Sequence, residues 1–144
     1  MTTALYLQHI DRLCSREFPA ERVRSGSGVS GPGYHSACLS ADEEEWEDIT
    51  QRLELRAQCV ADHEALIAEL TRRWEQPQWI SLWSTQARLV AGEAIAEPWA
   101  EFAVGFDFLH LWHVDGRWVA VGLDLEEDGP GWDLSVTVTK TAPP

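Results

Sequence analysis

Basic residues are scarce in this chain. Its 144 residues hold 11 Lys and Arg against 24 Asp and Glu, which gives a formal net charge of −13. Residues 1–40 carry four Arg against three acids, so the acidic excess lies entirely in residues 41–144. Excess acid keeps a small protein soluble, but a field of this sign also repels nucleic acid and anionic membranes and favours basic partners. The composition therefore predicts a basic protein partner, with no role for nucleic acid or membrane.

Long apolar runs and paired cysteines are missing as well. No apolar stretch approaches the roughly 20 residues that cross a bilayer, and no positively charged segment leads into an apolar one at the N-terminus. Cys14, Cys38 and Cys59 are odd in number and widely spaced, without a CxxC pair. We therefore expect a cytoplasmic protein whose cysteines act as small core residues rather than as zinc ligands.

Catalytic motifs are also lacking. The sequence contains no GxSxG, HExxH, P-loop or GxGxxG pattern. His110 and His113, three residues apart on a predicted strand, point to opposite faces and cannot share one metal ion. No sequence pattern singles out one carboxylate as a general acid or base. The sequence thus predicts no catalytic residue, cofactor or metal site, and it favours a non-enzymatic protein.

The most regular feature present is a run of 36 residues from Ser40 to Glu75 without Gly or Pro. Ser40 and Glu43 form a capping-box pattern, and Pro77 stops a helix, so the sequence predicts a long helix over 41–75. Apolar residues recur in steps of three and four from Trp46 to Trp74, which indicates one buried face.

This helix is too long for a compact domain. A straight helix of about 35 residues spans roughly 52 Å, whereas a compact domain of this size has a diameter of roughly 38 Å. The helix therefore bends, divides in two, projects into solvent or packs on a second subunit. The protein is accordingly expected to be a monomer or a homodimer formed through this helix.

The segments before the long helix differ sharply in composition. Tyr6, Ile10 and Leu13 have helical spacing, which predicts a first helix over 3–17. Residues 19–39 are rich in Gly and Ser and predict a flexible loop.

Residues 78–140 are predicted to be mainly β. Residues 78–84 alternate as a strand covered on both faces, and Asp115-Gly116 is the preferred pair for a type I′ hairpin turn within 108–125. A last strand, 132–140, alternates apolar and polar residues and is predicted to lie at the sheet edge. Between them, 87–90 suits a hairpin strand, whereas Pro98 suits the first position of a short helix.

These patterns together predict one α+β domain covering residues 1–144. The N-terminal helix and the long helix pack across one face of an antiparallel sheet of four or five strands, with the Asp115-Gly116 hairpin at its centre.

Eight tryptophans stand out against this background and suggest an interface, because tryptophan is enriched among residues that anchor partner proteins. The leading hypothesis is a non-catalytic module that docks a basic partner, as an immunity protein, an antitoxin or an adaptor would. The residues expected to contact the partner are Asp42, Glu43, Glu44, Glu45, Glu126, Glu127, Asp128, Trp79, Trp83 and Trp118.

The alternative hypothesis is a small-molecule-binding domain, which could be an enzyme. Its pocket would lie between the long helix and the sheet, lined by His63, His110, Trp112 and Trp118.

Overall fold

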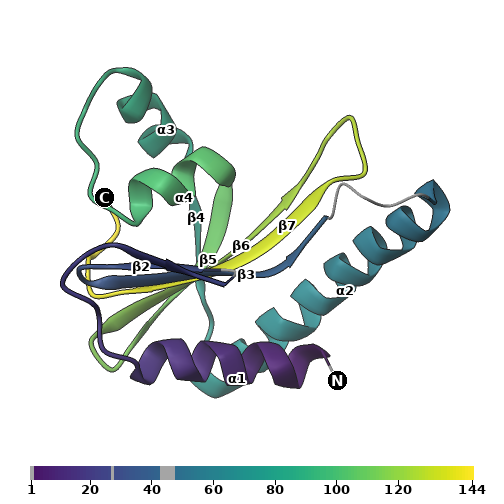
Figure 1. Ribbon diagram of the computed structural model, residues 1–144, viewed down its shortest axis with the longest axis horizontal. Coiled ribbons are helices and arrows are strands. Elements are labelled where there is room, and N and C mark those ends of the chain that lie inside the picture. The colour runs from purple at the N-terminus through teal and green to yellow at the C-terminus, as the bar shows by residue number, and fades with distance from the viewer. Residues whose placement is uncertain (1, 27, 43–47) are drawn as a thin grey trace.

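The computed structural model describes residues 2–26, 28–42 and 48–144, and it has an α+β architecture. Within these ranges, four helices pack on one seven-stranded antiparallel sheet (Figure 1). The elements in chain order are α1 (Thr2–Ser15), β1 (Val23–Ser25), β2 (Gly28–Gly31), β3 (Tyr34–Ala41), α2 (Ile49–Trp74), β4 (Gln78–Ser81), α3 (Trp83–Val90), α4 (Trp99–Gly105), β5 (Phe108–Val114), β6 (Arg117–Leu125) and β7 (Trp132–Thr139).

The strand order is β1-β2-β3-β7-β6-β5-β4, and every neighbouring pair is antiparallel. The α+β class and the antiparallel pairing are confirmed, whereas the predicted four or five strands are too few. β7 lies at the centre of the order, between β3 and β6, so the prediction that it is an edge strand is wrong. Its alternation of polar residues reflects a second surface rather than an edge.

The predicted loop over residues 19–39 is the reason for this error, because it folds as β1, β2 and most of β3. Pro32 and Gly33 form the turn between β2 and β3, and Gly33 has φ 86°, which fits a Pro-Gly turn. Gly28 must lack a side chain, because a Cβ there would lie 2.6 Å from the Ser36 carbonyl oxygen. The glycines of this segment therefore serve tight turns and close strand contacts instead of flexibility.

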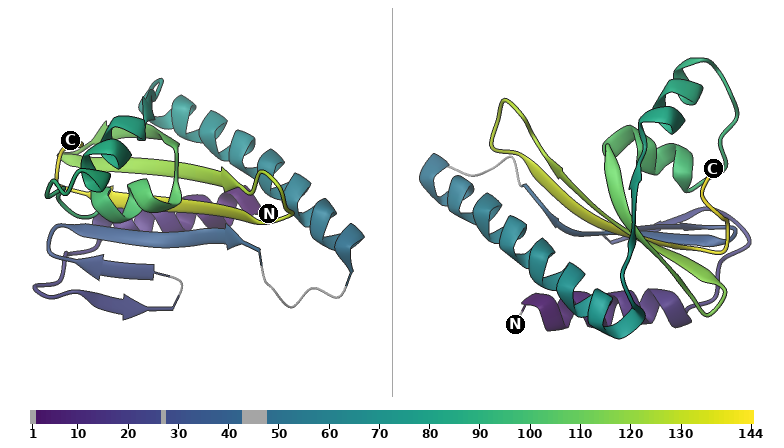
Figure 2. Two further views of the ribbon diagram at one scale, coloured as in Figure 1. Left: turned by 90° about the horizontal axis from the view of Figure 1, so that it is seen from above. Right: turned by 180° about the vertical axis from the view of Figure 1, so that it is seen from behind.

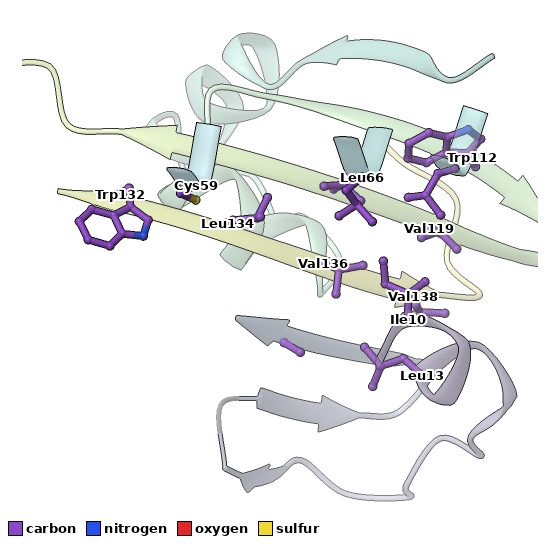
Figure 3. Close-up of a cluster of buried hydrophobic side chains, with 13 residues drawn as sticks. Ile10, Leu13, Cys59, Leu66, Trp112, Val119, Trp132, Leu134, Val136 and Val138 are labelled. Carbon is purple, nitrogen blue, oxygen red and sulfur yellow. The ribbon is translucent and has the colours of Figure 1, made fainter. Parts of the chain in front are cut away.

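The helices cover both faces of the sheet, although the sequence predicted helices on one face only. α1 and α2 lie on one face and α3 and α4 on the other (Figures 1 and 2). The α1–α2 face holds the larger buried apolar cluster (Figure 3). It consists of Ile10, Leu13, Ala37, Cys59, Leu66, Leu70, Trp112, Val119, Val121, Trp132, Leu134, Val136 and Val138.

Helix α2 begins later than predicted. Asp48 is its N-cap and accepts a hydrogen bond from the Thr50 backbone N–H, whereas Ser40 belongs to β3, so the capping-box prediction at Ser40 is wrong. With 26 residues the helix spans about 39 Å, and it ends at Trp74, ahead of Pro77 as predicted. Glu43, Glu44, Glu45 and Trp46 lie outside the described residues.

The buried side of α2 is turned by about one position from the predicted stripe. Cys59, Leu66 and Leu70 are its buried residues, whereas Ile49 and Leu53 are 56% and 49% exposed. The predicted stripe overlaps the core only in the second half of the helix. Association of two copies through α2 stays a prediction.

The hairpin of β5 and β6 has the predicted turn. Asp115 and Gly116 have φ values of 50° and 78°, as a type I′ turn requires. Trp112 pairs with Val119 on the α1–α2 face, and His113 pairs with Trp118 on the opposite face.

Helices α3 and α4 form the segment that the sequence left open. Residues 87–90 are the end of α3 rather than a strand, and α4 follows directly after Pro98, as predicted. Phe102 and Phe106 of α4 pack over Gly122, where an added Cβ would lie 2.8 Å from either ring. The buried cluster on this α3–α4 face comprises Leu82, Trp99, Phe102, Ala103, Phe106, Leu109, Leu111 and Ala120.

Candidate functional site

The four residues of the predicted pocket do not share one face of the sheet. The rings of His63 on α2 and His110 on β5 lie 5.5 Å apart, edge to face. Trp112 is buried on the same face, and its indole N–H donates to the Glu75 carbonyl oxygen at 3.0 Å. Trp118 lies on the opposite face, where it stacks on His113 at 4.1 Å. The structure therefore brings His63, His110 and Trp112 together and separates Trp118 from them.

The two adjacent histidines are kept neutral. Burial, with the charge of His110 as a smaller cause, lowers the pKa of His63 to about 4. Burial also lowers the pKa of His110. Across residues 2–26, 28–42 and 48–144, no group of three or more His, Cys, Asp or Glu side chains is arranged to hold a metal ion. This pair therefore acts as part of the packing between α2 and the sheet.

Two of the predicted contact tryptophans are strongly exposed. Trp79 on β4 is 62% exposed and lies against Phe108, with ring centroids 5.2 Å apart. Trp83, the first residue of α3, is 77% exposed. Trp118 is half-buried under the α3–α4 cluster. The edge of the sheet at β4 therefore presents a solvent-exposed aromatic surface.

The predicted acidic residues differ in their contacts: Asp42 is ion-paired, and Glu126 Oε2 accepts from the Gly131 backbone N–H at 3.1 Å. Asp42 forms an ion pair with Arg52, with Nε 2.9 Å from Oδ1, so its charge is already balanced. Glu126, Glu127 and Asp128 lie exposed in the loop between β6 and β7. This loop is fixed on α2, because Arg56 donates to the Glu126 carbonyl oxygen at 3.0 Å.

A row of carboxylates on the α3–α4 face escaped the sequence analysis. Asp124 on β6 lies directly opposite Asp133 on β7, and Asp107 precedes β5 on the next strand. Burial raises the pKa of Asp124, and the charges of Asp107, Asp133 and Glu126 raise it further. We call Asp107, Asp124 and Asp133 the carboxylate row. In the sequence, the row is indicated only by the polar residues that alternate along β7, a pattern that is also typical of an edge strand.

A groove opens beside this row, between α4 and the part of the sheet formed by β2, β3 and β7. Its volume is about 260 Å³. On this face no helix of the described residues lies above β1, β2 and β3, which α3 and α4 leave uncovered (Figure 2, left). The lining residues are Gly28, Val29, Ser36, Ala37, Cys38, Pro98, Glu101, Phe102, Gly105, Phe106, Asp133, Ser135 and Thr137. The groove therefore combines two acids and several hydroxyls with an aromatic wall.

The floor of the groove is hydrogen-bonded and carries no nucleophile. Ser36 Oγ and Thr137 Oγ1 are 2.8 Å apart, and Ser135 Oγ donates to Asp133 Oδ1 at 2.7 Å. Burial, and next the charge of Asp133, raises the pKa of the Cys38 thiol to about 11. The thiol is therefore protonated at neutral pH and is not an activated nucleophile. The arrangement suits binding rather than covalent chemistry.

Among the described residues, no helix is both long enough and apolar enough to cross a membrane. Comparison with protein-family models, with curated proteins and with solved structures found no match for this chain.

Proposed function

We propose that this chain is a non-catalytic binding module that docks a basic partner protein, as an immunity protein, an antitoxin or an adaptor does. The surface involved comprises the carboxylate row, the loop residues Glu126, Glu127 and Asp128, and the exposed aromatic edge at β4.

The observation that carries the proposal is the placement of Asp124 opposite Asp133 in neighbouring strands. Like charges directly opposite each other destabilise a sheet, and the pKa of Asp124 is raised by burial first and then by the charges of Asp107 and Asp133. Acids spread over the surface would keep the protein soluble without that cost. A basic partner would relieve the repulsion, because its charges complement the row.

Of the two exposed tryptophans, Trp83 lies nearer the carboxylate row, because the Leu82 backbone N–H donates to the Asp107 carbonyl oxygen at 2.7 Å. Trp79 pairs with His110 and therefore points, with Phe108, to the α1–α2 face across the sheet edge. Exposed Trp side chains bury a large area on binding and are frequent anchors in protein interfaces. The acids would steer the partner during approach, and Trp83 would then bury its ring against it, with Trp79 reached only around the edge of the sheet.

The experiment uses a fluorescent decapeptide of alternating Arg and Gly as the probe, with a Glu and Gly decapeptide as its counterpart. Fluorescence anisotropy is measured at low and at high salt for the wild type and for the variant D124N/E127Q/D128N. We expect only the Arg peptide to bind, with an affinity that falls with salt and falls at least tenfold in the variant.

The matched control removes the same charge elsewhere. E21Q/E64Q/E93Q neutralises three exposed acids outside the carboxylate row and its loop. If total charge alone attracts the peptide, both triple variants lose affinity equally, and the proposal fails. Binding of the control variant close to that of the wild type supports a localised surface.

A small-molecule-binding domain is the second candidate, and the groove beside α4 is the observation that favours it. At about 260 Å³ the groove is smaller than the roughly 300 to 1,000 Å³ of most ligand pockets. A metabolite library screened by amide chemical shifts tests this function. Saturable shifts at Ser36 and Ser135 with one compound class would favour it over the docking of a protein.

A further inference from the structure

The groove beside α4 has the size and charge for one side chain of a partner. It is lined by Glu101 from α4 and by Asp133 from β7, and none of its lining residues is Lys, Arg or His. An anionic ligand would therefore meet two carboxylates and no positively charged lining residue. Electrostatics favours a cationic occupant.

The floor of the groove leaves hydrogen-bonding capacity unused. Asp133 Oδ1 accepts from Ser135, whereas Oδ2 accepts no hydrogen bond from the described residues. Ser36 and Thr137 carry two hydroxyl protons, and the single bond between them uses only one. Ser36 is half-buried and Thr137 is fully buried, and both residues line the groove. The floor can thus accept from N–H donors and can also donate once to a carbonyl.

The wall of the groove is aromatic and rigid. Phe102 and Phe106 stack with ring centroids 4.5 Å apart, and their position over Gly122 fixes them against the sheet. Planar guanidinium groups stack on aromatic faces and bind carboxylates through two parallel N–H bonds. An ammonium group would use the charge but not the planar stacking.

The rim of the groove already contacts a guanidinium of the chain itself. Arg22 Nη2 lies 3.5 Å from Glu101 Oε2, and both side chains are more than half exposed. Exposed ion pairs of this kind contribute little to stability and exchange readily with other partners. A guanidinium brought by a partner can therefore replace this contact at low cost.

We propose that the groove seats an arginine side chain of the basic partner, with the guanidinium on Asp133 and against Phe102. This inference rests on the proposed function and names the group that is recognised. The carboxylate row leads to the groove, because Asp133 belongs to both.

The test is a two-dimensional amide NMR titration of the full chain with the blocked tripeptide Gly-Arg-Gly. The same peptides with citrulline, a neutral isostere, or with Lys are the controls. We expect saturable shifts at Ser36, Phe102, Ser135 and Thr137 with the Arg peptide, and shifts at least tenfold weaker with citrulline. D133N should weaken binding at least tenfold, whereas E64Q, which removes an exposed acid on α2 outside the groove and the docking surface, should leave it within twofold.

A second variant guards against a D133N protein that folds poorly. Gly105 lines the groove, and a Cβ added there meets no atom within 4 Å, so G105L fills the groove without a clash at its base. It should abolish the Arg-dependent shifts. Equal shifts from citrulline or Lys, or full binding to G105L, would overturn the inference. If the Arg decapeptide still binds in those cases, the docking function stands and only the arginine seat is wrong.

Discussion

The two sides of β7 show how differently one alternating strand can be used. Trp132, Leu134, Val136 and Val138 face α1 and α2 and are buried in the larger apolar cluster. Asp133, Ser135 and Thr137 face the opposite way and form the floor of the groove beside α4. One side is closed by two helices, and the other is covered only in part.

The difference teaches that polar alternation does not by itself mean an edge or a solvated face. β7 is the central strand, and its polar residues are largely covered, because Thr137 and Thr139 are fully buried. A central strand normally carries apolar residues on both faces when both are covered. The polar side of β7 carries hydrogen bonds within the sheet, from Ser135 to Asp133 and between Thr137 and Ser36, and the proposed binding uses what these bonds leave free.

The largest effect expected from this comparison is on stability. Leu134 is fully buried, so L134A should lower the free energy of unfolding by about 2 to 5 kcal/mol. S135A, the next residue, loses one hydrogen bond to Asp133 and should change it by about 1 kcal/mol or less. Urea denaturation of both variants measures the difference. Equal losses would mean that the polar side is a structural layer like the apolar one.

The apolar side of the sheet was predictable from the sequence, and the polar side was not. Local rules fix the Asp115-Gly116 turn, and the turn fixes the pairing of Trp112 with Val119. The prediction that β7 is an edge strand was wrong because residues 19–39 form strands that continue the sheet beyond β7. Their pairing is non-local: Ala37 pairs with Val136, about 100 residues away, and no local pattern reports that contact.

The candidate site was predictable only in its ingredients. The exposed positions of Trp79 and Trp83 agree with the predicted contact role but do not test it. The carboxylate row needs the register of β6 against β7, and the groove needs the position of α4, which Gly122 allows by lacking a side chain. Of the residues predicted to line a pocket, Trp118 lies apart from the other three because it alternates away from Trp112 within the hairpin.

An intermediate loss of stability is expected from a substitution where α4 packs on the sheet. G122A would place a Cβ 2.8 Å from Phe102 and Phe106, and relieving this overlap should cost about 1 to 3 kcal/mol of unfolding free energy. G105A, at the end of α4, adds its Cβ to open space and should lower the free energy of unfolding by less than about 0.5 kcal/mol. Thermal and urea unfolding compare the two variants. A harmless G122A would mean that the aromatic wall can shift, and the groove would then not be preformed.

The smallest effect, and the one that separates the two faces most directly, is their response to acid. On the α1–α2 face, His63 has a pKa of about 4, so below pH 6.5 the unfolded chain binds a proton that the folded chain refuses. Burial of the neutral His63 therefore costs no stability above pH 6.5. As the pH falls from 6.5 toward 4, proton binding by the unfolded chain lowers the free energy of unfolding. On the α3–α4 face, the raised pKa of Asp124 has the opposite effect, because burial and, to a smaller extent, the neighbouring carboxylates favour the protonated form in the folded state.

Urea midpoints between pH 7 and pH 4.5 for the wild type, H63L and D124N measure both terms. H63L should lose less stability on acidification than the wild type, because the group responsible is gone. D124N should be more stable at pH 7 by about 0.2 to 1 kcal/mol and should lose more on acidification, because it lacks the compensating term. If all three curves are parallel, neither group titrates as its surroundings require. A D124N protein that is more stable at pH 7 yet binds the Arg peptide less would show that this carboxylate is kept for binding at the expense of folding.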